Sequence, residues 1–106
     1  MATTKRPITN WNMHPGEILR EEFLKPLGLS VYELAKRLHV PAPRLNDIGL
    51  ERRGISADTA VRLAQFFETS EQFWMNLQTS YEVRRAKVEL RRELLKIKPR
   101  SAEDAA

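Results

Sequence analysis

Hydrophobic residues recur along most of this chain every three or four positions, the spacing that places side chains on one side of an α-helix. The first series consists of Ile18, Leu19, Phe23 and Leu27, with Pro15 before it and Gly28 after it. No stretch alternates between apolar and polar residues with a period of two, as a half-buried strand would. The pattern therefore predicts an all-α fold whose first helix ends at Gly28.

Two further short helices are expected between Ser30 and Ile48, separated by little more than a turn. Ser30 stands three residues before Glu33, the spacing of a capping box, in which the hydroxyl and the carboxylate each accept a backbone N–H. The second helix is therefore expected to run from about Ser30 to His39. Its inward positions are Leu34, Ala35 and Leu38.

The third helix is expected to begin with two prolines. If Val40 or Pro41 is its N-cap, Pro41 and Pro43 fall in the first turn, where their missing N–H groups would have no partner inside the helix. The prolines then start the helix and do not break it. Leu45 and Ile48 turn toward the core. Two short helices joined this closely predict a helix-turn-helix unit.

Two more helices complete a predicted five-helix domain. The fourth is expected from about Ser56 to Phe67, and the fifth starts at Thr69, paired with Gln72, or at Ser70 alone. The fourth helix is expected to bury Ala57, Ala60, Val61, Leu63, Ala64 and Phe67. The fifth is expected to cover the bundle with Phe73, Trp74, Leu77 and Tyr81.

Toward the C-terminus the apolar residues fall on two stripes of one long helix, which is expected to reach roughly 25 to 30 residues. The first stripe consists of Val83, Ala86, Leu90, Leu94 and Ile97, and the second of Tyr81, Val88 and Leu95. A helix that lies on a domain needs one such side, so the other is expected to pack on a second chain, either a twin or a partner protein. The expected contact residues are Tyr81, Val83, Val88, Leu90, Leu94, Leu95 and Ile97. Homodimerisation is the preferred use.

The 106 residues predict one domain with short appendages. The expected parts are an N-terminal arm (1–13), the helix-turn-helix domain (14–80), the C-terminal helix (81–98) and a tail (99–106). The arm and the tail are polar and unpatterned, and are expected to be mobile. The absence of cysteine excludes disulfides and thiolate metal sites. Neither a secretory signal nor a membrane-spanning run is recognisable, so a cytoplasmic location without membrane contact is expected.

The basic residues are distributed unevenly along the chain. The formal net charge is +4, yet residues 14–80 hold eight basic and nine acidic side chains, whereas residues 81–100 hold eight and three. Within the near-neutral part, the basic side chains of Lys36, Arg37, Arg44, Arg52 and Arg53 gather around the helix-turn-helix unit. Such a one-sided basic surface suits a phosphate binder, and a merely solvated charged surface is the alternative.

A helix-turn-helix that binds DNA places its second helix in the major groove while the first lies against the backbone. Arg44 could then donate a pair of hydrogen bonds to guanine and Asp47 could accept one from cytosine. Ala42 and Pro43 could contact a thymine methyl, and Asn46 lies between the outward side and the core. The remaining DNA-binding candidates are Ser30 as helix cap, Lys36, and Arg52 with Arg53 as phosphate clamps. The alternative is a corner of a helical bundle that touches no nucleic acid.

The chain offers no enzyme motif. His14 opens the first helix and His39 closes the second, so they do not form a metal cluster. A nucleophile elbow and a glycine-rich phosphate loop are both missing from the sequence. We therefore expect no catalysis, metal or cofactor.

Three separated motifs carry a resemblance to a known family. They are HPGEILREEFLKPLGLSVYELAKRLHVPAPRLNDI, RRGISADTAVRLAQFF and FWMNLQTSYEVRRAK, which together span roughly residues 13–87. They closely resemble HigA-type antitoxins, members of the phage-repressor-like group of five-helix helix-turn-helix domains. The resemblance implies an antitoxin that neutralises a HigB-like ribonuclease toxin by protein contact and, usually as a dimer, represses its operon through a palindromic operator. An orphan regulator or protein-interaction module without a toxin partner is the alternative.

The sequence departs from the family pattern at one expected contact. Family members often carry a glutamine directly after the capping serine, where it can touch a phosphate or a base. Val31 stands there in this chain and can make no polar contact. The resemblance therefore leaves the fold secure and the operator sequence and affinity open.

Overall fold

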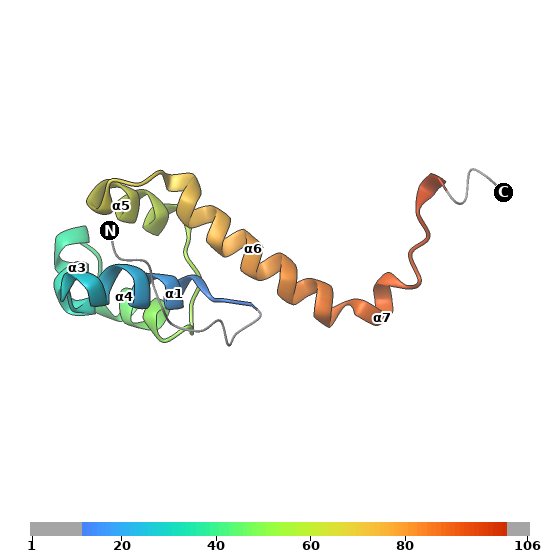
Figure 1. The fold of residues 1–106 in the computed structure, drawn as a ribbon, viewed down its shortest axis with the longest axis horizontal. Coiled ribbons are helices and arrows are strands. Elements are labelled where there is room, and N and C mark those ends of the chain that lie inside the picture. The colour runs from blue at the N-terminus through green and yellow to red at the C-terminus, as the bar shows by residue number, and fades with distance from the viewer. Residues whose placement is uncertain (1–11, 102–106) are drawn as a thin grey trace.

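The computed structural model describes residues 12–101, and the predicted mobility of residues 1–11 and 102–106 lies outside that part. All of its regular secondary structure is helical: α1 (Pro15–Ile18), the π-helical η1 (Leu19–Leu24), α2 (Lys25–Leu27), α3 (Val31–Leu38), α4 (Ala42–Gly49), α5 (Ala57–Phe67), α6 (Glu71–Glu89) and α7 (Arg91–Leu94). The first three segments form one continuous helix. Figure 1 shows a bundle from which α6 extends outward. The predicted all-α, five-helix domain with a C-terminal helical extension is confirmed.

A π-helical stretch changes which side of the first helix is buried. Its hydrogen bonds connect residues five apart, as from Lys25 N–H to the Arg20 carbonyl, so side chains five apart share a side. Leu19 and Leu24 are accordingly buried in the core, whereas Leu27 is 62% exposed. The prediction that Leu27 faces inward is therefore wrong, because it assumed a regular α-helical repeat. Gly28 ends the helix in a left-handed conformation, with φ at 61°.

The start of α1 lies unusually close to the end of α4. His14 is the N-cap of α1, and its Nδ1 accepts a hydrogen bond of 2.9 Å from the Gly16 N–H. A Cβ atom on residue 16 would lie only 1.8 Å from the Ile48 carbonyl oxygen. Only glycine therefore permits this approach of the two backbones.

The predicted second helix is confirmed as α3. The Ser30 hydroxyl accepts a 3.0 Å hydrogen bond from the Glu33 N–H, and the Glu33 carboxylate lies 3.4 Å from Arg37 Nε. The three inward residues, Leu34, Ala35 and Leu38, are buried as predicted. His39 ends the helix in a left-handed conformation, with φ at 57°.

The third helix is confirmed as α4, with Pro41 as its N-cap and Pro43 in its first turn. Leu45 and Ile48 are fully buried, as predicted. The helix therefore lies with one side in the core and its opposite side outward.

The fourth helix, α5, is rotated slightly from its predicted orientation. Ala60, Leu63 and Ala64 are buried and Phe67 is partly buried, but Ala57 and Val61 are exposed and Thr59 takes an inward place. Burying Thr59 is possible because Ser56 Oγ lies 3.3 Å from its hydroxyl oxygen and accepts its N–H. The expectation for Ala57 and Val61 is therefore wrong.

The fifth helix, α6, starts at Ser70, whose hydroxyl accepts a 3.0 Å hydrogen bond from the Phe73 N–H. Thr69 does not cap this helix. Its Oγ1 accepts a 2.8 Å hydrogen bond from Trp74 Nε1. Trp74 is fully buried, and its ring packs 4.8 Å from that of Phe23. The predicted core role is confirmed for Trp74, whereas Phe73 is 37% exposed and packs on the Trp74 ring at 5.0 Å.

Two contacts bring residues from outside the predicted 14–80 range onto the bundle. Tyr81 packs edge-on against the His14 ring at 4.8 Å, and Asn12 Nδ2 donates a 3.0 Å bond to the Tyr81 carbonyl. Asn12 is itself buried. The described domain thus includes both Asn12, assigned to the arm, and Tyr81, assigned to the extension.

The C-terminal helix is shorter than the predicted 25 to 30 residues. The 19-residue α6 ends at Leu90, where ψ changes to 10°, and the four-residue α7 follows. Residues 87–101 are exposed, so no tertiary packing holds one long helix together in this part of the chain. Six of the seven predicted contact residues are exposed: Val83, Val88, Leu90, Leu94, Leu95 and Ile97.

We predict that Gly16→Ala lowers the free energy of unfolding by about 2 to 3 kcal/mol, because the added methyl group overlaps the Ile48 carbonyl. Urea denaturation followed by circular dichroism measures the change. Gly49→Ala is the matched control, since a Cβ there would meet only the Val31 side chain, at an ordinary 3.8 Å. An equal loss of stability in both variants would contradict the close-approach explanation.

Candidate nucleic-acid interface

The helix-turn-helix unit consists of α3, the turn at His39–Pro41, and α4, which lie side by side at one end of the bundle (Figure 1). Pro43 is exposed on the outward side of α4, while Ala42, Arg44, Asn46 and Asp47 are partly exposed. Of the predicted base-contacting residues, Pro43 is thus the most exposed, whereas Ala42 packs against the core. That DNA contacts these residues is a prediction.

Arg44 and Arg53 lie beside the same open hollow of about 370 Å³, which is also lined by Gly54, Ser56, Asp58 and Thr59. The hollow lies between the start of α4, the loop after it and the start of α5. The structure therefore brings one of the two predicted phosphate clamps close to the predicted base-contacting arginine.

The loop after α4 folds back on the helix end. Glu51 adopts a left-handed conformation, with φ at 63°, and the Arg52 N–H donates a 2.8 Å bond to the Asp47 carbonyl. The side chains of Arg52 and Arg53 are exposed. Both guanidinium groups are therefore presented to solvent next to α4, as phosphate clamps require.

Ser30 and Lys36 do not line this hollow. Ser30 caps the start of α3, and its hydroxyl oxygen accepts the Glu33 N–H. Lys36 is exposed in the last turn of the same helix. The structure thus places them at opposite ends of α3. Their contact with DNA remains a prediction.

Two residues that connect the elements of this site were not predicted from the sequence. Asp58 Oδ1 lies 3.1 Å from Arg44 Nη1 and 2.7 Å from Arg62 Nε. Arg62 Nη1 also donates to the carbonyl oxygens of Leu38, at 2.7 Å, and His39, at 3.2 Å. The i,i+4 spacing of Asp58 and Arg62 in the sequence indicates their ion pair, whereas the contact of Asp58 with Arg44 of α4 depends on the tertiary structure.

The charge of Asp58 is stabilised by its partners. The hydrogen bond from Arg62 is the main cause that lowers the pKa of Asp58, and the nearby Arg44 lowers it further. The carboxylate therefore remains ionised at neutral pH. The Arg44 guanidinium is accordingly held in an ion pair in this structure.

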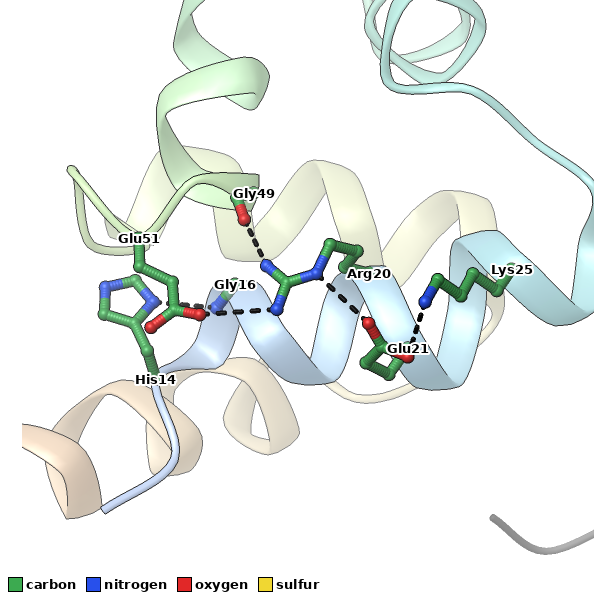
Figure 2. Close-up of polar contacts among 7 residues, drawn as sticks. All are labelled: His14, Gly16, Arg20, Glu21, Lys25, Gly49 and Glu51. Atoms are coloured by element: carbon green, nitrogen blue, oxygen red, sulfur yellow. Dashed lines mark hydrogen bonds and ion pairs between the residues drawn. The ribbon is translucent and has the colours of Figure 1, made fainter. Parts of the chain in front are cut away.

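Arg20, also missed, fixes the other end of α4 (Figure 2). Its Nη1 donates to the Gly49 carbonyl, and its Nη2 lies 3.4 Å from Glu51 Oε2. Its Nε donates a 3.2 Å bond to Glu21, which also accepts a 2.9 Å bond from Lys25. The Lys25 bond is the main cause that lowers the pKa of Glu21. The first helix thus holds the carbonyl end of α4 through one guanidinium group.

A family model described as helix-turn-helix matches residues 20–74, which include the whole of the unit just described. The solved structure of Pseudomonas aeruginosa antitoxin HigA with the higBA promoter superposes with a TM-score of 0.82 at 49% sequence identity, and the match covers 84% of this chain and 98% of that one. The chain belongs to the helix-turn-helix family, among the HigA-type antitoxins. The resemblance recognised in the sequence is thereby confirmed.

Further relatives agree with this assignment. The structure of antitoxin GraA in complex with its operator has a TM-score of 0.78 at 42% identity, and the match covers 94% of this chain and 96% of that one. Virulence-associated protein I of Dichelobacter nodosus is 57% identical over 74 residues, or 70% of this chain and 68% of its own length. The chain also matches 66% of the length of a helix-turn-helix-type transcriptional regulator of Escherichia coli K12, at 38% identity. The family consists of DNA-binding regulators and antitoxins, not of enzymes.

Within residues 12–101, no three histidine or acidic side chains come together in a group that could hold a metal ion. No helix in the same range is long and apolar enough to span a bilayer.

His14 of this HigA-type chain couples the fold to pH. Burial is the main cause that lowers the pKa of His14 below its ordinary 6.5, and Arg20 and Arg85 lower it further, whereas Glu51 opposes the shift. The neutral ring is also the form whose Nδ1 can accept the Gly16 N–H. The folded protein therefore binds a proton at His14 less readily than the unfolded chain does.

We predict that stability is highest above pH 6.5 and declines as the pH falls toward the lowered pKa of His14, because the unfolded state takes up the proton first. His14→Asn keeps a helix-capping side chain and should remove this part of the pH dependence. His39→Asn is the matched control, since His39 is exposed and asparagine tolerates its left-handed backbone. The measurement is the urea midpoint from pH 8 to pH 5, and identical profiles for wild type and His14→Asn would refute the assignment.

Proposed function

We propose that this chain is an antitoxin that binds the operator of its own operon through α4, represses that operon, and neutralises a HigB-like ribonuclease toxin by protein contact. The observation that carries the DNA-binding part is the placement of α4. Leu45 and Ile48 of this helix are buried in the core, while Pro43 is exposed and Arg44 partly exposed, and the exposed Arg52 and Arg53 lie in the loop after the helix. The relatives solved with a promoter and with an operator support the same use of this unit.

In this proposal the residues divide into two groups. The first group contacts bases: Arg44 donates hydrogen bonds to guanine, and Asp47 accepts one from the cytosine amino group. Ala42 and Pro43 contact a thymine methyl group, and Asn46 lies at the margin of this base-contacting surface. The phosphate contacts come from Ser30 at the start of α3, from Lys36 in its last turn, and from Arg52 and Arg53 in the loop after α4. The pyrrolidine rings at the start of α4 supply no N–H donors, so the arginines carry the anchoring.

A short recognition helix offers few base contacts, and pairing two copies on a palindrome doubles them. We propose that the copies associate through the exposed apolar side chains of the C-terminal segment, from Val83 to Ile97. The break at Leu90 supports a bent contact and not a single long coiled coil. Operator binding of this kind takes place in the cytoplasm.

One observation favours a second candidate, a protein-interaction module that binds no specific DNA. Arg44 is ion-paired to Asp58 in the structure, and an arginine used in this way could serve structure alone. The two functions differ in sequence preference, because a basic module without base contacts binds all duplexes weakly and in a salt-dependent manner.

We predict that Arg44→Ala weakens binding to the operator by about 5- to 150-fold for each half-site, the range of one bidentate base contact. Binding to a scrambled duplex should change little. Fluorescence anisotropy with the DNA upstream of this gene and with the scrambled duplex measures both affinities.

Arg37→Ala is the charge-matched control for Arg44→Ala. Arg37 is exposed on α3, where its guanidinium lies over the Phe66 ring at 5.9 Å and pairs with Glu33. Its removal deletes one positive charge from the same domain but no predicted base contact. Unchanged operator affinity in Arg44→Ala, or equal losses in the two variants, would speak against α4 as the sequence reader.

We predict that replacing both Arg52 and Arg53 with alanine lowers affinity for operator and scrambled DNA alike. Each lost phosphate contact reduces the slope of log K against log salt by about 0.9, so the double variant should lose about 1.8 for each protomer. Titrations at several salt concentrations measure the slope. A slope identical to that of wild type would exclude both arginines from phosphate contact.

A further inference from the structure

An acidic side chain stands beside the arginine that we assign to base reading. Asp58 lies in the first turn of α5, and its Oδ1 contacts Arg44 Nη1 at 3.1 Å and Arg62 Nε at 2.7 Å. Arg62 in turn donates to the carbonyl oxygens of Leu38 and His39 at the end of α3. The carboxylate is therefore fixed relative to both helices of the helix-turn-helix unit.

We propose that Asp58 is a specificity-determining residue, which orients the Arg44 guanidinium toward base edges and keeps it away from phosphates. The inference rests on the proposed function, because it concerns how α4 distinguishes its operator from other DNA.

The first part of the inference is orientation. A guanidinium group is planar and has five N–H donors, so a contact that fixes one nitrogen restricts the whole plane. Among residues 12–101 the Asp58 carboxylate is the hydrogen-bond partner of the Arg44 side chain, and it occupies Nη1. Nη2 and Nε then remain for a bidentate contact with guanine O6 and N7. Because the side chain is ordered before binding, less conformational entropy is lost in the complex.

The second part is repulsion. A phosphate oxygen that approached Arg44 would also approach the Asp58 carboxylate, which lies 3.1 Å from the guanidinium. Two negative charges so close together oppose each other, whereas the neutral acceptors of guanine suffer much less repulsion. Specificity often depends on such an element directed against the wrong partner. Asp58 thus lowers the affinity of Arg44 for DNA backbone in any sequence.

The ion pair itself contributes little to folding. The side chains of Arg44 and Asp58 are 31% and 57% exposed, and exposed pairs stabilise proteins only weakly. Asp58 also pairs with Arg62 at 2.7 Å, and this pair is exposed as well, at 57% and 38%, so Asp58→Asn is expected to fold with a urea midpoint close to that of wild type. This separates an effect on DNA discrimination from a loss of structure.

The experiment compares the dissociation constants of the full-length chain for two duplexes, one from the region upstream of this gene that wild type protects and one scrambled. We expect Asp58→Asn to bind the scrambled duplex more tightly and to lower the ratio of the two constants by about fivefold or more, the scale of one base contact. Asp58→Glu should recover part of the ratio. In an Arg44→Ala background, Asp58→Asn should no longer change it.

Glu33→Gln is the matched control, because Glu33 is a partly exposed carboxylate of the same domain that pairs with Arg37 at 3.4 Å. It removes the same charge at a distance from Arg44, and it should leave the ratio unchanged. The inference is overturned if Asp58→Asn keeps the wild-type ratio, or if Glu33→Gln lowers it equally. If wild type itself binds both duplexes equally, the proposed function fails, and the inference falls with it.

Discussion

The anchoring of α4 by Leu45 and Ile48 is the constraint on which the rest of the structure depends. An eight-residue helix is not stable alone in water, so its conformation must come from tertiary packing. Full burial of each side chain contributes about 1.5 to 3 kcal/mol. Because both lie on one side of the helix, their burial also determines which residues face outward. Gly16 belongs to this constraint, since its missing side chain lets α1 meet the Ile48 carbonyl.

Arginine side chains hold the two ends of α4 in place. Arg20 contacts the Gly49 carbonyl and Glu51 at the end of the helix, while Arg62 and Asp58 connect its start to α3 and α5. These contacts join residues far apart in the chain. Most are partly exposed, so their contribution to stability is small and their contribution to geometry is the larger one. A DNA-binding helix needs such geometry, because base contacts tolerate little displacement.

The C-terminal segment is the part of the described chain whose conformation depends least on the bundle. The first half of α6 is fixed by Trp74, Gln78 and Tyr81, which contact Thr69, Ile55 and His14 in turn. Beyond Ala86 the side chains are exposed, and the helix breaks at Leu90. The exposed valine, leucine and isoleucine residues of this basic segment form the surface that we propose for the contact between two copies.

The sequence by itself determined the helical class, the capping serines, the prolines that start α4, and the buried pair Leu45 and Ile48, because these follow from local hydrogen bonding and periodicity. The tertiary structure alone decided three matters: the π-helical turn that exposes Leu27, the rotation of α5, and the pairing of Arg44 with Asp58. The physical reason is that each of them depends on which distant groups are near enough to pack, donate or repel, and a pattern read along one chain does not contain those distances.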